Sequence, residues 1–138
     1  MSRGKTRTEG CGSAEGRTRA TSAGKFLEVA RLLQDEDDAA SWSVAASLTV
    51  LAGIAAVDAA CCYALGRRSR GDDHHDAEPL VAMVMPRGAV AATALRRLID
   101  LKDKAQYGMI HVSRNDLKVA MRQAEMLVDF ANEMRPLT

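Results

Sequence analysis

The chain has 138 residues, which is enough for one compact domain with one hydrophobic core and too few for a second domain. Of these residues, 47% are apolar but only five are aromatic, and the apolar set is dominated by helix formers such as Ala and Leu. This composition favours an all-α protein. The formal net charge of +1 conceals a basic N-terminal end, because residues 1–25 contain six basic side chains and only two acidic ones.

The N-terminal segment, residues 1–23, mixes Gly, Ser, Thr and Arg without an apolar period. Such a segment cannot bury enough surface to offset the entropy of ordering it. The sequence therefore predicts a disordered basic tail over residues 1–23, followed by a helical domain over residues 24–138. The tail is either a solvated leader or an arm that attracts nucleic acid. It lacks the apolar core and cleavage site of a secretory signal.

The three cysteines, Cys11, Cys61 and Cys62, are odd in number, and two of them are adjacent. Their spacing fits neither a zinc site nor a disulfide framework. We therefore expect Cys61 and Cys62 to be small hydrophobic core residues. A reducing, cytoplasmic location is the simplest interpretation.

Two helices are predicted in the first half of the domain. Apolar residues at helical spacing predict a short amphipathic helix over residues 24–35. Residues 39–65 are apolar on nearly every side, which is typical of a helix in the centre of a core or in a membrane. Asp58 and the many small, weakly hydrophobic residues favour the core of a soluble protein.

Three more helices are predicted in the second half. A helix over residues 73–85 requires Pro79 to lie in its first turn or to bend it. A helix over residues 88–107 has a clear apolar stripe, with Gly108 placed as its left-handed cap. The last helix opens at Ser113 with a capping-box pattern and keeps its apolar period to Met134. The predicted fold is an all-α, up-and-down bundle of four to five helices.

The order of these elements, together with the stretches LKDKAQYG and SRNDLKVAMRQAE, resembles the HEPN domain family over about residues 24–135. In that family a helix typically closes on a charged, a small and a polar residue followed by Tyr, here Tyr107. The resemblance implies a helical, nucleotide- or RNA-associated domain. It also implies a separately encoded partner, either a nucleotidyltransferase or an antitoxin.

Catalytic members of the HEPN family are metal-independent ribonucleases with an Arg followed, four to six residues later, by a His. The stretch RRSRGDDHHDAEPL meets this spacing with Arg68 and His74, which are separated by five residues, and with Arg70 and His75, which are separated by four. Arg67 and His74 also fit, with six residues between them. A His can move the protons of RNA cleavage, and a guanidinium can hold the phosphate. The candidate catalytic residues are therefore Arg68, Arg70, His74 and His75.

The same stretch also has a simpler interpretation, as a solvated corner at the start of a helix. Its four carboxylates would repel phosphate, whereas acidic side chains favour the positive end of a helix dipole. We expect Asp73 or its neighbour to cap the helix and both His residues to lie in its first turn. No metal site is predicted, because adjacent side chains on a helix diverge by about 100 degrees. No cofactor is predicted.

Three further residues, Asp58, Arg67 and Tyr107, form a second candidate polar site. A buried Asp58 needs a partner, and we expect Arg67, Arg96 or Arg97 to supply it. The alternative is that Asp58 faces a nucleotide groove.

Three functions remain open from the sequence. The first is a HEPN-like binding domain in a nucleotide- or RNA-related system, the second a metal-independent ribonuclease of toxin type, and the third a structural interaction module without a ligand. The helix over residues 39–65 is too apolar to be covered by short neighbours, so we also expect a homodimer. We expect no membrane partner.

Overall fold

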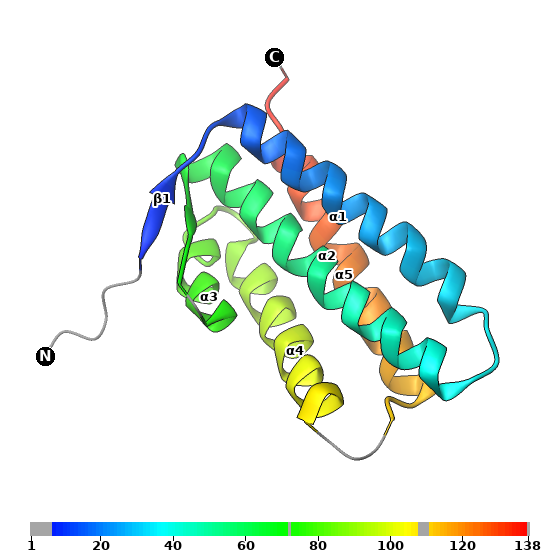
Figure 1. Cartoon of the computed structure of the whole chain (residues 1–138). Helices are drawn as coiled ribbons and strands as arrows, with labels where there is room; N and C mark the ends of the chain where they lie inside the picture. Colours follow the sequence, from blue (N-terminus) through cyan, green and yellow to red (C-terminus); the bar gives the residue numbers. More distant parts are fainter. Residues whose placement is uncertain (1–6, 72, 108–110, 138) are drawn as a thin grey trace, which may run out of the picture.

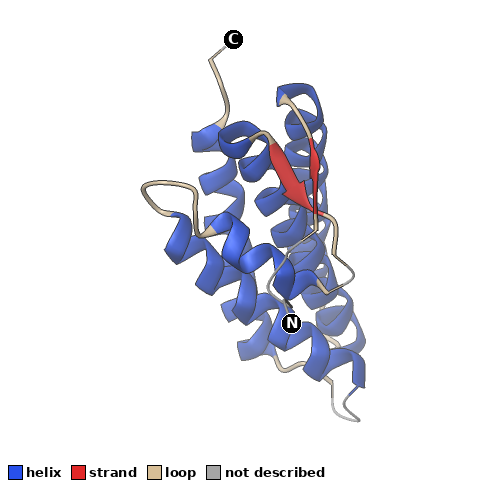
Figure 2. Cartoon of the chain, turned by 90° about the vertical axis from the view of Figure 1, so that its left-hand side faces the viewer, coloured by secondary structure: helices blue, strands red, loops and turns tan. Residues whose placement is uncertain are grey.

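The computed structural model describes residues 7–71, 73–107 and 111–137, and within them the protein is a bundle of α-helices with a small two-stranded ribbon (Figures 1 and 2). The elements, in chain order, are β1 (Thr8–Gly10), α1 (Ser13–Gln34), α2 (Ala39–Leu65), β2 (Arg67–Ser69), the 3-10 turn η1 (His74–Asp76), α3 (Ala77–Val81), α4 (Gly88–Tyr107) and α5 (Arg114–Met134). The predicted all-α bundle is confirmed.

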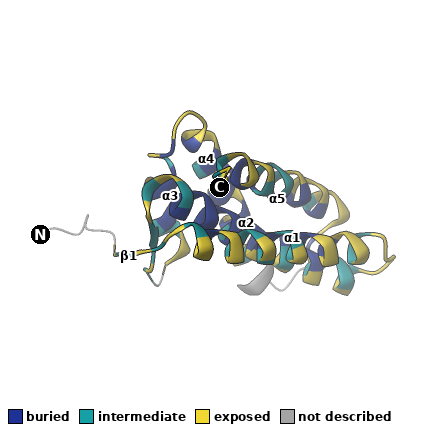
Figure 3. Ribbon diagram, turned by 90° about the horizontal axis from the view of Figure 1, so that it is seen from above, coloured by how far each residue is buried: buried dark blue, intermediate teal, exposed yellow. Residues whose placement is uncertain are grey.

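Helix α2 occupies the centre of the bundle, where it contacts α1, α4 and α5 (Figure 1). Of its 27 residues, 14 are buried, and half of these are Ala (Figure 3). Small side chains let the neighbouring helices approach closely. At Gly53 there is no room for a Cβ atom, which would lie 2.5 Å from Cδ1 of Leu98. This helix is long and apolar enough to cross a membrane by length and composition, but 72% of its most apolar window is buried inside the fold. In this fold it is a core helix.

The predicted disordered tail is wrong for residues 7–23, because Thr8–Gly10 form β1 and α1 begins at Ser13 rather than at residue 24. The Gly12 amide donates a hydrogen bond to Glu15 Oε1 at 2.7 Å, and this contact starts the helix. The buried residues of α1 recur three to seven positions apart along one face that packs on α2. This face begins with Gly and Ala, so it gives no hydrophobic signal in the sequence. The buried residues are Gly16, Ala23, Leu27 and Ala30.

Helix α1 is long enough to cover much of α2. A 22-residue α1 covers one side of α2, so the expectation that short neighbours cannot bury α2 is wrong. Some large apolar side chains stay exposed, among them Val44 and Leu51 on α2.

The boundaries predicted for three of the helices agree closely with the structure. Residues 39–65 and 88–107 are helical over the predicted ranges, and the Ser113 hydroxyl accepts a hydrogen bond from the Asp116 amide at 3.0 Å. The predicted cap at Gly108 lies outside the described residues. The helix predicted over residues 73–85 is shorter than expected, since it divides into η1, α3 and a series of turns. Pro79 lies in the first turn of α3, as predicted.

A disulfide joins Cys11 to Cys62, with the two Cα atoms 5.2 Å apart. The prediction that the cysteines form no disulfide is therefore wrong. Cys11 follows β1 and Cys62 lies in the last turn of α2, so the bond fastens the N-terminal segment to the central helix. Cys61 keeps its thiol and is buried, as predicted.

Deletion of residues 1–22 is expected to lower the melting temperature by about 10 °C or more. It removes the disulfide, the first turns of α1 and the Arg19 partner of a buried carboxylate, and losses of this kind amount to several kcal/mol. Differential scanning calorimetry of the two proteins measures the change. An unchanged melting temperature would show that residues 7–22 do not pack as described.

Candidate functional site

The end of α2 and the β1–β2 ribbon position a group of arginines. Gly66 ends α2 in the left-handed conformation, with φ of 72°, which turns the chain sharply into β2. In the antiparallel ribbon, Glu9 lies opposite Arg68. The Cys11 amide donates to the Gly66 carbonyl at 3.0 Å beside the disulfide. The β1–β2 pairing, the hydrogen bond from Cys11 to Gly66 and the disulfide therefore hold Arg68 against the end of α2.

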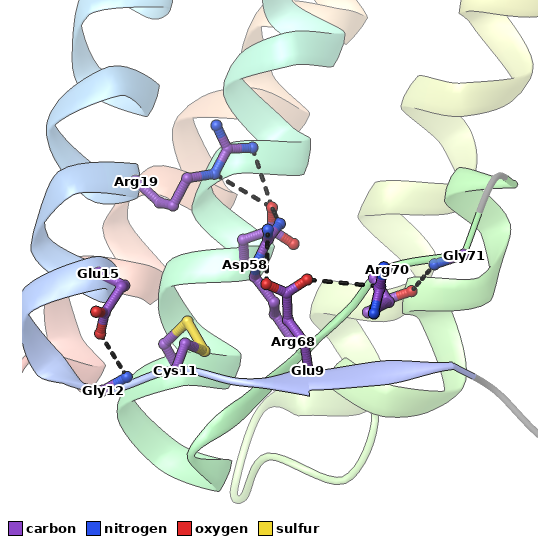
Figure 4. Close-up of polar contacts among 11 residues, drawn as sticks. Glu9, Cys11, Gly12, Glu15, Arg19, Asp58, Arg68, Arg70 and Gly71 are labelled. Carbon is purple, nitrogen blue, oxygen red and sulfur yellow. Dashed lines mark hydrogen bonds and ion pairs between the residues drawn. A yellow bond between two sulfur atoms is a disulfide. The ribbon is translucent and has the colours of Figure 1, made fainter.

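Asp58 is the buried centre of this group, with 9% of its side chain exposed (Figure 4). Its Oδ2 accepts hydrogen bonds from Arg19 Nε at 3.2 Å and Nη2 at 3.0 Å, and it lies 3.6 Å from Arg68 Nη1. The need for a cationic partner was predicted correctly, but the choice of Arg67, Arg96 or Arg97 was wrong. Arg19 was missed because it belongs to the segment predicted to be disordered.

Burial raises the pKa of the Asp58 carboxyl above its ordinary value, while Arg19 first, then Arg68 and His74, act in the opposite direction. The carboxylate therefore depends on the arginines to remain ionised inside the fold. This dependence explains why one Oδ2 atom faces two guanidinium groups.

Glu9 forms a second, more exposed layer of ion pairs. Its carboxylate lies 3.4 Å from Arg68 Nη2 and 3.6 Å from Arg70 Nε. These separations are longer than those of strong charge-assisted hydrogen bonds. Arg70 is the most exposed of the three arginines, with 61% of its side chain accessible. Figure 4 shows the Glu9 carboxylate joined to Arg70 by a dashed line, near Arg68 and Asp58.

A hollow of about 310 Å³ is lined by three arginines, Asp58 and His74. We call it the arginine pocket. It brings together four of the predicted candidate residues, Asp58, Arg68, Arg70 and His74, and adds Arg19. His74 is exposed and also lines a neighbouring apolar hollow. The complete lining of the arginine pocket is Arg19, Ile54, Asp58, Arg68, Ser69, Arg70, Gly71, His74, Ala77 and Leu95.

His75 does not line the arginine pocket. Its Nδ1 contacts the Glu78 carboxylate, and its Nε2 lies 3.6 Å from Asp100 Oδ1 on α4. The hydrogen bond with Glu78 raises the pKa of His75, although burial acts in the opposite direction. The ring is thus engaged in fastening η1 to α3 and α4. Asp73 caps η1 by accepting from the His75 amide at 2.9 Å, as the corner interpretation predicts.

His75, Asp100 and Asp103 place potential ligand atoms within 4.8 Å of one another. Both aspartates are exposed, so solvent can stabilise their charges. The sequence offered no sign of this cluster, because the two aspartates come from α4. We assign no metal to it.

The remaining candidate residues lie apart from the arginine pocket. Arg67 pairs with Gly10 in the ribbon and is half-buried near Cys61. Burial raises the pKa of the Cys61 thiol to about 12, which disfavours the thiolate form that a nucleophile requires. The side chain of Tyr107 lies outside the described residues.

No protein-family model, no curated protein and no solved structure matches this chain. Function therefore has to be inferred from the geometry and chemistry of the site.

Replacement of Arg19 by Met is expected to lower the free energy of unfolding at pH 7 by about 3 kcal/mol, because it removes the main partner of a buried carboxylate. The loss should shrink toward pH 4. Without Arg19 the pKa of Asp58 rises further, so the variant loses stability as the pH increases through that pKa. Urea unfolding at several pH values measures both effects.

Two further variants test the cause of that loss. Arg17→Met removes an exposed arginine from the same helix and should change stability little. Adding Asp58→Asn to Arg19→Met should recover part of the loss, since no buried charge is then left unpaired. A pH-independent loss in Arg19→Met would contradict the assigned ion pair.

Proposed function

We propose that this chain is a HEPN-like helical binding domain whose arginine pocket holds the phosphate of a nucleotide or an RNA. One observation carries the proposal: Arg19, Arg68 and Arg70, from α1 and the ribbon segment, converge with His74 on one hollow. Guanidinium groups bind phosphate through paired hydrogen bonds, and a neighbouring imidazole adds a further donor.

The charge balance of the pocket supports an anionic ligand. Within these ion pairs, three arginines face two carboxylates, those of Asp58 and Glu9, which leaves one positive charge in excess. Asp58 is buried behind the arginines, whereas Glu9 is at the exposed edge with 41% of its side chain accessible. A phosphate can therefore replace Glu9 as the outer partner of Arg68 and Arg70 without disturbing the inner ion pair.

Binding can be measured by the fluorescence anisotropy of a labelled single-stranded RNA 12-mer. Arg70→Ala is expected to weaken binding about tenfold and to reduce the dependence of affinity on salt, since one phosphate contact is lost. Arg122→Ala removes an exposed arginine from α5 and serves as the matched control. Equal affinities of wild type, Arg70→Ala and Arg122→Ala would contradict phosphate binding in this pocket.

A metal-independent ribonuclease is the second candidate function. It is favoured by the presence of His74 in the same hollow as Arg68 and Arg70, which is the Arg and His pairing expected from the HEPN resemblance. In this function His74 transfers a proton to or from a ribose or leaving oxygen, and the arginines stabilise the charged phosphate. His75 is a poor candidate, because both of its ring nitrogens face carboxylates.

If the chain is a ribonuclease, it should cleave single-stranded RNA in the presence of a chelator. His74→Ala should reduce the rate at least 100-fold by removing the proton-transfer group, whereas His75→Ala should leave most of it. Gel electrophoresis of a labelled RNA measures the rates. Cleavage that survives His74→Ala would rule out this mechanism. Induction of the protein in cells, scored by growth arrest, tests for a toxin that needs a cellular partner.

A homodimer with a separately encoded nucleotidyltransferase or antitoxin partner remains part of the proposal. The exposed Val29 and Leu32 on α1 are apolar positions at which a second copy can pack. Light scattering at micromolar concentration should then report a mass of about twice 14.8 kDa, and a monomer would refute the dimer.

A cytoplasmic location is compatible with the buried core helix but fits poorly with the disulfide, since reducing compartments keep cysteines as thiols. Acid quenching of the cells, alkylation of the denatured protein and mass spectrometry distinguish the two cases. Three modified cysteines in the denatured protein support the cytoplasm, and one modified cysteine supports an oxidising compartment.

A further inference from the structure

We infer that the arginine pocket and the apolar hollow beside it form one site for a small organic anion with an apolar body. The inference rests on the proposed function for its anionic end and adds a second subsite for the rest of the ligand. The head group lies at the arginines, and the body lies along α2.

The apolar hollow has a volume of about 400 Å³. Five of its lining residues follow one side of α2 at spacings of four, three, one and three, so they form a continuous stripe along the helix. His74 and Lys102 line its other side. The α2 residues are Ser43, Ser47, Val50, Leu51 and Ile54.

The apolar hollow and the arginine pocket share two lining residues, Ile54 and His74. The two spaces therefore adjoin at this point. One end of the combined groove is lined by arginines, and the other is lined mainly by aliphatic side chains. Leu51 is 45% exposed, so the apolar end is open to a ligand from solvent.

The two serine hydroxyls on the α2 wall of the apolar hollow are already engaged within the protein. Ser47 Oγ donates to the Ser43 carbonyl at 3.3 Å, and Ser43 Oγ accepts from the Val112 amide at 3.2 Å. This wall consequently offers mainly apolar surface to a ligand. Small-molecule sites commonly combine such an apolar space of several hundred Å³ with a few charged groups that fix one end of the ligand.

These features select a ligand with one anionic head and an apolar body of modest size. A planar base carried by a nucleoside monophosphate has this chemistry, and so does an alkyl chain carried by a phosphate. Inorganic phosphate has the head alone. Comparison of the three ligands therefore isolates the contribution of the body.

The experiment measures Kd by isothermal titration calorimetry for inorganic phosphate, AMP and octyl phosphate. At least one of the two organic phosphates should bind ten times more tightly than inorganic phosphate. Ser47→Trp fills the apolar hollow and should abolish that gain while leaving phosphate affinity unchanged. Val44→Trp adds the same bulk to α2 at an exposed position outside the hollow and should keep the gain. The melting temperatures of both variants are measured to check that they are folded.

Arg70→Ala and Ser47→Trp should both weaken the binding of the same organic phosphate, because the two substitutions act on opposite ends of one ligand. A gain with AMP alone identifies a base as the body, and a gain with octyl phosphate alone identifies an alkyl chain. The inference is overturned if neither ligand exceeds phosphate, if the gain survives Ser47→Trp, or if binding is insensitive to Arg70→Ala. If inorganic phosphate and RNA bind but neither organic phosphate binds more tightly than inorganic phosphate, the proposed function stands and this inference fails. If none of these ligands binds, both fail.

Discussion

The ion pair between Asp58 and Arg19 is the constraint on which much of the rest of the structure depends. A carboxylate in the middle of an apolar helix is stable only when a cation reaches it, and Arg19 does so from α1. This contact joins α1 to α2 at one buried point, in addition to the apolar packing between the two helices. Arg68 completes the arrangement from the ribbon, so a requirement of the core places the basic residues of the candidate site.

Sequence patterns were sufficient where apolar residues of ordinary size mark a face. The ranges of α2, α4 and the capped start of α5 were predictable for this reason. The first half of α1 was not predictable, because its buried face begins with Gly16 and Ala23, and such small residues are also common in flexible segments. Small residues pack well only when another helix is close, and that proximity is a tertiary property.

The candidate site was predictable only in part, because some of its residues are close in the sequence and others are not. Arg68, Arg70 and His74 are near one another in the sequence, so their proximity in the fold required no long-range information. Arg19 is 39 positions from Asp58 and lay in the segment assigned to the tail. The sequence also could not distinguish His74 from His75. The difference comes from Glu78 and Asp100, which engage His75 and leave His74 beside the arginines.

The Cys11–Cys62 disulfide also changes the connectivity of the molecule. The bond closes a covalent ring through 51 positions of sequence that contains all of α1 and nearly all of α2. The turn between these helices, residues 35–38, is exposed and is the natural place for a protease to cut. A cut there opens the ring but separates no fragment, so α1 stays attached beside Asp58. The disulfide therefore keeps the bundle covalently connected after a single cut between α1 and α2.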